Sequence, residues 1–199
     1  MWKFKKSLKK ILEPRLEESK EGKRRVFFID AAHFIHGAFL STLWSIKRMF
    51  VKANSGRSRL NVLGAIDAVT KQMVYLTNTT TINAWSLVEL FRKLRELYPH
   101  EQITLVLDNA KYQRCYVSQT AAKMLNIELL FLAPYSPSLN LIERVWKFIR
   151  SKCLNAKYYA TFVEFMKGIE DCIEAFQGTF QEELNSLLTW NFQALPKVL

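Results

Sequence analysis

Three acidic residues stand where short apolar runs end or where a helix is predicted to begin. Asp30 closes the run RVFFID, Asp108 closes ITLVLD, and Glu143 lies near the start of a predicted helix. Ligands of sheets flanked by helices gather at the carboxyl ends of parallel strands. Asp30 and Asp108 are therefore expected to be neighbours if their strands pair in parallel, and Glu143 is expected to reach the same place from its helix.

Three carboxylates in one place repel one another unless a cation neutralises them. Oxygen ligands of this kind are the ones that hard cations such as Mg²⁺ and Mn²⁺ prefer. Two such ions, about 3.5 to 4 Å apart, can activate the attacking oxygen and stabilise the leaving oxygen of a phosphoryl transfer. The pattern therefore predicts a metal-dependent site for phosphoryl transfer.

A structural interpretation of the same residues stays open from spacing alone. An Asp at the end of a strand often opens a turn, which would account for Asp30 or Asp108 taken singly. Glu143 lies three residues after Asn140. That spacing fits a capping box, in which the two side chains satisfy backbone donors at a helix start.

The composition indicates one globular domain that attracts polyanions. The chain has 199 residues, of which 49% are hydrophobic, and 29 Lys and Arg against 18 Asp and Glu give a net charge of +11. Such an excess of positive charge favours nucleic acid as the partner. We expect a basic helical segment over residues 1–24, interrupted at Pro14, with a solvated stub as the alternative, and one domain over residues 25–199.

The three cysteines and the apolar runs bear on the compartment. Cys115, Cys153 and Cys172 lack the paired spacing of a zinc site or a disulfide scaffold and are interpreted as reduced thiols. No apolar run reaches the roughly 18 residues of a membrane span, and no apolar stretch follows the basic start as in a signal peptide. The expected location is cytoplasmic, associated with the nucleoid, with no membrane partner.

Apolar periodicity predicts a mixed α/β sheet with antiparallel strands first and parallel strands later, flanked by helices. Strands are predicted at residues 25–30, 60–70, 71–77, 103–108 and 127–132, and helices at 83–99, 116–126, 139–154 and 161–190, with a break at Gly178. Residues 39–50 are predicted to be a strand or a lid, and residues 52–60 a turn region.

Three blocks of sequence resemble the signature blocks of DDE transposases in the bacterial insertion-sequence branch of the Tc/mariner superfamily. The blocks are FFIDAAHF, LVLDNAKYQ and LLFLAPYSPSLNLIERVWKFIRSK. The 34 residues between Asp108 and Glu143 (109 to 142) resemble the spacing of that branch. The resemblance runs from about residue 24 to about residue 155.

The resemblance implies a ribonuclease-H-like fold in which Asp30, Asp108 and Glu143 hold Mg²⁺ or Mn²⁺, two ions in all. It implies metal-dependent hydrolysis at a transposon end, followed by attack of the freed 3′-hydroxyl on target DNA, in cut-and-paste transposition of a mobile element into TA dinucleotides. A homodimer or a higher synaptic assembly with transposon ends and target DNA is expected. Pro134, Tyr135 and Pro137 are expected to fix the turn that aims Glu143.

Several polar residues near the acidic ones are candidates for DNA contact, with a solvated surface or a structural role as the alternative. They are His33, Asn109, Lys111, Arg114, Arg144, Lys147, Arg150 and Lys152. His33 and His36 are expected to contact phosphate or to pack rather than to ligate a metal. Trp146 is expected to pack in the core rather than to stack on bases.

The chain departs from this family in its N-terminal part. Only about 24 residues precede the first strand, too few for the helix-turn-helix modules with which relatives recognise their transposon ends. A separate helix-turn-helix polypeptide from a split reading frame, a degenerate copy or a shortened chain are the three explanations. Two alternative functions stay open: a non-catalytic or truncated DNA-binding or regulatory remnant, and a stand-alone nuclease of the same fold.

Overall fold

A computed structural model gives the fold for residues 2–37, 58–132 and 140–189. The predictions for residues 39–50, for most of the turn region 52–60, and for Pro134, Tyr135 and Pro137 lie outside these described residues.

The centre of the molecule is a five-stranded sheet in the order β3-β2-β1-β4-β5. The strands are β1 (Arg24–Ile35), β2 (Arg59–Asp67), β3 (Met73–Asn78), β4 (Gln102–Leu107) and β5 (Ile127–Phe131). Strand β2 pairs antiparallel with β1 and β3, whereas β1, β4 and β5 run parallel. The predicted mixed sheet, antiparallel first and parallel later, is confirmed.

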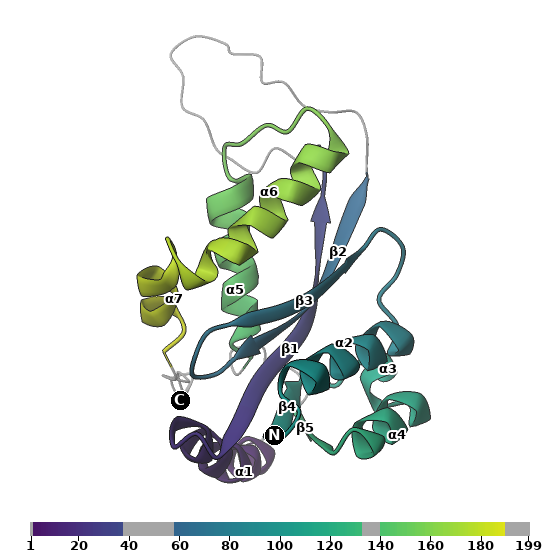
Figure 1. The fold of residues 1–199 in the computed structure, drawn as a ribbon, viewed down its shortest axis with the longest axis vertical. Helices are drawn as coiled ribbons and strands as arrows, with labels where there is room; N and C mark the ends of the chain where they lie inside the picture. The colour runs from purple at the N-terminus through teal and green to yellow at the C-terminus, as the bar shows by residue number, and fades with distance from the viewer. Residues whose placement is uncertain (1, 38–57, 133–139, 190–199) are drawn as a thin grey trace.

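Helices cover both faces of this sheet (Figure 1). They are α1 (Trp2–Lys20), α2 (Ala84–Leu97), α3 (Lys111–Arg114), α4 (Tyr116–Met124), α5 (Ile142–Ile149), a π-helical turn η2 (Arg150–Leu154), α6 (Phe162–Glu174), a 3₁₀ turn η3 (Ala175–Gln177) and α7 (Gln181–Leu187). One apolar core lies between the sheet and α2 with α4. The other lies between the opposite face and α1, α5, η2, α6 and α7.

The first helix packs on the sheet instead of standing in solvent. Leu12 and Leu16 are buried in the second of these cores, and Arg15 donates to both oxygens of Glu128 on β5. Pro14 lies inside the single helix α1, so the predicted interruption is wrong. Proline disfavours a helix interior because it lacks the N–H and crowds the preceding turn. The buried leucines and the Arg15 ion pair hold the helix in place despite that penalty.

Strand β1 is longer than predicted, and Asp30 lies inside it rather than at its end. The ladder with β4 ends at the pair Phe28 and Val106, but β2 continues to pair with β1 as far as Ile35. The apolar run that ends at Asp30 therefore marks the end of parallel pairing, not the end of the strand.

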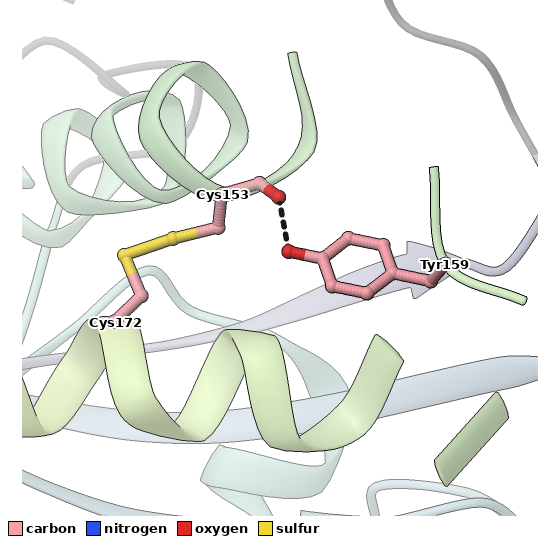
Figure 2. Close-up of a disulfide and its surroundings, with 3 residues drawn as sticks. All are labelled: Cys153, Tyr159 and Cys172. Atoms are coloured by element: carbon pink, nitrogen blue, oxygen red, sulfur yellow. Dashed lines mark hydrogen bonds between the residues drawn. A yellow bond between two sulfur atoms is a disulfide. The ribbon is translucent and has the colours of Figure 1, made fainter. Parts of the chain in front are cut away.

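The interpretation of all three cysteines as reduced thiols is wrong for two of them. Cys153 in η2 and Cys172 in α6 form a disulfide, and both residues are buried (Figure 2). Tyr159, in the loop that the bond closes, donates its hydroxyl hydrogen to the carbonyl of Cys153 at 2.6 Å. Sequence spacing does not show this pairing because it arises from the packing of two separate helical segments. Cys115 is a free thiol.

Among the described residues, no helix is both long enough and apolar enough to cross a membrane.

The disulfide is expected to stabilise the helices that cover one face of the sheet. It joins residues 19 apart, and closing a loop of that size stabilises a fold by about 3 kcal/mol in the chain-entropy treatment. A reducing agent should lower the free energy of unfolding of the wild type by about this amount. The double variant Cys153→Ala and Cys172→Ala should show no response to the reducing agent.

Alkylation of the denatured, unreduced chain gives an independent check by mass spectrometry. One modified cysteine, Cys115, is the expected result. Three modified cysteines would contradict the disulfide.

Candidate active site

Asp30 and Asp108 lie side by side at the end of the β1–β4 ladder. The last pair of that ladder is Phe28 and Val106, and each Asp lies two residues further along its chain. Side chains alternate along a strand, so Asp30 shares a face with Phe28, and Asp108 shares one with Val106. Phe28 and Val106 belong to the same core, which α5 covers. Both carboxylates therefore point toward the face on which Glu143 lies.

The charge of Asp30 is strongly disfavoured in this position. Burial, together with the negative charges of Asp108 and Glu143, raises the pKa of its carboxyl from 3.8 to about 7. Hydrogen bonds from the Ala31 backbone and the Trp146 indole act in the opposite direction. Three carboxylates from β1, from the residue after β4 and from α5 thus interact through their charges.

The three carboxylates are neighbours, but they are not close enough together to coordinate a metal ion. Within the described residues, no three His, Cys, Asp or Glu side chains are gathered closely enough to hold a metal ion. Charges interact over longer distances than those of direct metal coordination. The carboxylates can therefore influence the pKa of Asp30 without being close enough together to bind one metal ion. The assignment of Asp30, Asp108 and Glu143 as metal ligands stays a prediction.

Trp146 fixes the orientation of Asp30. Its indole Nε1 donates to Asp30 Oδ2 at 3.0 Å, and the ring is almost fully buried. Gly64 pairs with Asp30 across β1 and β2. A Cβ at Gly64 would lie 2.8 Å from Trp146 Cη2 and 3.2 Å from the side chain of Ile142, and it would also meet Met73. The absence of a side chain at residue 64 therefore lets the indole reach Asp30. The prediction that Trp146 packs in the core is confirmed, and its hydrogen bond to Asp30 is a contact that the sequence does not show.

A buried glutamine shapes the turn that follows Asp108. Asn109 has a left-handed backbone with φ of 87°, and its side-chain oxygen accepts from Arg114. Gln113 is fully buried and accepts hydrogen bonds from the backbone N–H groups of Asn109 and Ala110 at 2.9 and 3.0 Å. Asp108 Oδ1 itself accepts from Ala110 N at 3.3 Å, so the turn-opening interpretation of Asp108 also holds. No sequence motif singled out Gln113.

The predicted capping box of Asn140 and Glu143 is not formed. The residue that caps α5 is Leu141, with no side-chain hydrogen bond. Asn140 instead donates its side-chain Nδ2 to the carbonyl of Ile29 at 3.2 Å. The turn backbone, in which Glu143 N donates to Asn140 O at 3.3 Å, begins the helix without side-chain help.

Two of the residues predicted to contact DNA also form contacts within the protein. Arg144 donates to the carbonyls of Leu187 and Thr189, at the end of α7. Lys152 forms an ion pair with Glu183 on α7 at 2.7 Å. Both side chains therefore hold the C-terminal helix against α5 and η2. Their contact with DNA stays a prediction.

The other candidates for DNA contact have varied surroundings. His33 lies three residues after Asp30 on β1, so it projects from the opposite face of the sheet, where Nδ1 lies 2.7 Å from Asn61 Oδ1. The guanidinium groups of Arg114 and Arg150 lie over the rings of Phe131 and Phe34, respectively. Lys111 and Lys147 are exposed and close in sequence to Asp108 and Glu143. His36 is buried against Phe162 and Phe165.

Comparison with known proteins gives one family match and several structural ones. The sequence profile of a family described as DDE superfamily endonuclease matches residues 25–166. No curated protein sequence matches the chain. The catalytic domain of Mos1 mariner transposase has the same fold, with a TM-score of 0.62 and 15% identity over 94% of this chain and 87% of that one.

Two larger Mos1 assemblies also match. A paired-end complex with the left transposon end has a TM-score of 0.67 and 16% identity, and covers 94% of this chain. A paired-end complex with Mn has a TM-score of 0.67 and 17% identity, and covers 92% of this chain. The present chain spans 58% of the length of each of those transposase chains. At these identities the likeness shows the fold, which is ribonuclease-H-like as expected.

The raised pKa of Asp30 makes the stability of the metal-free chain depend on pH. The carboxyl loses its proton near pH 3.8 in the unfolded chain but near pH 7 in the folded one. Its contribution to stability is therefore fully present below about pH 4 and is lost as the pH rises through about 7. The free energy of unfolding of the wild type should fall by roughly 3 kcal/mol relative to Asp30→Asn across that window, after allowance for partial exposure. Urea denaturation in a chelating buffer measures this, and a constant difference between the two proteins would contradict it.

The packing of Trp146 against Gly64 predicts coupling between the two residues. Gly64→Ala should destabilise the wild type by about 1 to 3 kcal/mol, because the added methyl overlaps the indole. In a Trp146→Phe background, which lacks the Cη2 atom, the same change should be clearly less destabilising. A double-mutant cycle of denaturant unfolding measures the difference. Equal effects in both backgrounds would show that the contact is absent.

Proposed function

The chain belongs to the DDE superfamily endonucleases, and from this premise we propose that it is the catalytic domain of a DNA transposase. In this proposal Asp30, Asp108 and Glu143 bind the divalent cations, and the chain cleaves DNA at a transposon end and joins the freed 3′-hydroxyl to target DNA. The three sequence blocks that resemble the bacterial insertion-sequence branch of the Tc/mariner superfamily support this narrower assignment.

The observation that carries the proposal is the electrostatic coupling of three carboxylates from distant points of the chain. The pKa of Asp30 is raised by burial and then by Asp108 and Glu143, although the chain as a whole carries a net charge of +11. Neutralising one carboxylate with a nearby lysine or arginine would have been the simpler way to stabilise the fold. Among the described residues, no lysine or arginine forms an ion pair with Asp30, Asp108 or Glu143, and an acidic cluster of this kind in a basic protein favours a site that a cation completes.

The oxygen-only donor set fits Mg²⁺ or Mn²⁺. Two such ions, once bound, would supply the positive charge that stabilises the attacking and leaving oxygens in an in-line displacement. Mos1 transposase has been solved in paired-end complexes with Mn and with Mg, which supports divalent cations here by analogy of fold.

The protein's own residues hold the acidic side chains for this chemistry. Trp146 orients Asp30 by donating a hydrogen bond to its Oδ2. Gln113 ties down the turn after Asp108, so that this exposed carboxylate keeps a defined position. Glu143 lies on α5, whose apolar face is buried on the sheet. Positioning of this kind keeps a metal site within the narrow geometry that phosphoryl transfer needs.

The DNA partner is proposed from the net charge and from the family. A net charge of +11 favours a polyanion, and Lys111 and Lys147 are the exposed cations nearest in sequence to two of the acidic residues. Two of the Mos1 matches are paired-end complexes, one of them with the left transposon end, which supports an assembly of two or more chains on paired ends. A separate helix-turn-helix polypeptide is the proposed partner for sequence-specific recognition of the ends.

Strand transfer in vitro tests this function. The full chain, mixed with a pre-cleaved duplex carrying the ends of its own element, Mn²⁺ and a target plasmid, should yield joined products. Asp108→Asn should reduce joining by roughly 100-fold or more, since even outer partners of a metal site change activity about 10- to 100-fold. Asp171→Asn, a matched change at an exposed residue of α6, should have no effect.

Each other outcome selects an alternative. Hydrolysis without joining would favour a stand-alone nuclease of the same fold. DNA binding with neither reaction, in wild type and Asp108→Asn alike, would favour a non-catalytic DNA-binding or regulatory remnant.

A further inference from the structure

Asn140 has a buried side-chain oxygen without a hydrogen-bond partner. The residue is 3% exposed, and its Nδ2 donates to the carbonyl of Ile29 at 3.2 Å. Its Oδ1 is the single buried side-chain polar atom in the described part of the chain that accepts or donates no hydrogen bond. A buried unsatisfied amide oxygen destabilises a protein by about 1 to 3 kcal/mol, so its presence calls for an explanation.

The alternation of backbone carbonyls along β1 shows where this amide lies. The carbonyl of Val26 points to β2, because it accepts from Ala68 N at 2.8 Å. Carbonyls alternate sides along a strand, so the carbonyl of Ile29, three residues on, points to the β4 side. The β1–β4 ladder has already ended there, at Phe28 and Val106. The side chain of Asn140 therefore occupies the end of that ladder, between the strands that lead to Asp30 and Asp108.

Asn140 also lies just before the helix that carries two residues of the candidate site. It precedes Leu141, the N-cap of α5, and Glu143 and Trp146 lie three residues apart on one side of that helix. Asn140 contacts the backbone of Ile29, and Trp146 contacts the carboxylate of Asp30, one residue further along β1. The two contacts lie on either side of Glu143 and hold its helix turn against β1.

We propose that Asn140 Oδ1 accepts a hydrogen bond from a water molecule in the hydration shell of the divalent cation held by Asp30, Asp108 and Glu143. This inference rests on the proposed function. Mg²⁺ and Mn²⁺ keep several waters when few carboxylates bind them, and each such water is a strong donor that needs an acceptor. An amide oxygen serves as that acceptor without adding a fourth negative charge to a cluster that already repels itself.

A purely structural role for Asn140 explains its Nδ2 but not its Oδ1. The donor Nδ2 fastens the start of α5 to β1, and an asparagine placed for that purpose alone would leave Oδ1 buried and unsatisfied. Partners in the outer shell of a metal typically change its affinity 10- to 100-fold when they are removed. The proposal therefore predicts a loss in cation affinity, which a structural role alone would not produce in a folded variant.

Binding of Mn²⁺ to the metal-free full chain, followed by electron paramagnetic resonance of the free ion, tests the proposal without an activity assay. Asn140→Leu keeps the size of the side chain and removes both polar atoms. It should bind Mn²⁺ about 10- to 100-fold more weakly than the wild type. The matched control is Asn61→Leu, which removes a fully buried asparagine on β2 that hydrogen-bonds Asn78 and Thr80. It should leave the affinity for Mn²⁺ within about two-fold of the wild type.

A second variant decides the matter if Asn140→Leu does not fold. Asn140→Asp keeps an acceptor oxygen and loses the donor to Ile29. Measured at high salt, which screens the general attraction of the added charge, it should bind Mn²⁺ at least as tightly as the wild type. An affinity reduced ten-fold or more would overturn the proposal, as would an unchanged affinity in a folded Asn140→Leu. A wild type that binds no Mn²⁺ would instead overturn the proposed metal site and this inference with it.

Discussion

The burial of the Asp30 carboxyl beside Asp108 and Glu143, at the end of the β1–β4 ladder, is the constraint on which the rest of the site depends. Burial and the charges of Asp108 and Glu143 together raise the pKa of Asp30 to about 7. A fold can keep such a cluster only if the surrounding contacts hold it in place. Trp146 holds Asp30, Gln113 holds the turn after Asp108, and the buried face of α5 holds Glu143.

Much of this arrangement follows from patterns that a sequence displays. Apolar runs that end in an acidic residue predicted the parallel core of the sheet, because buried parallel strands are nearly continuous in apolar residues. The neighbouring positions of Asp30 and Asp108 follow from the parallel register of β1 and β4, which the structure confirms. The motif around Glu143 predicted that its helix brings this residue to the same place as Asp30 and Asp108. These features depend on local periodicity and on the order of elements, both of which are encoded at short range.

The features that sequence reasoning missed depend on tertiary packing. Asp30 lies within β1 because β2 continues to pair with β1 beyond the last β1–β4 pair. The sequence of β1 does not show how long its partner strand is. The Cys153–Cys172 bond joins two helical segments whose contact arises only in the folded chain. Arg144 and Lys152 also bind residues of α7, a contact that depends on where the C-terminal helix packs and that the sequence does not show. The buried Oδ1 of Asn140, which has no hydrogen-bond partner, likewise becomes evident only in the folded structure.

The central claim is that the three carboxylates form one electrostatic unit that a divalent cation completes. Carbon-13 NMR of the Asp30 side-chain carboxyl, titrated with pH in the metal-free chain and again with Mg²⁺ present, tests it most directly. The account predicts a pKa of about 7 without the cation, a lower pKa in Asp108→Asn, and a large further decrease when Mg²⁺ binds. A pKa near 3.8 that responds to neither change would contradict the account.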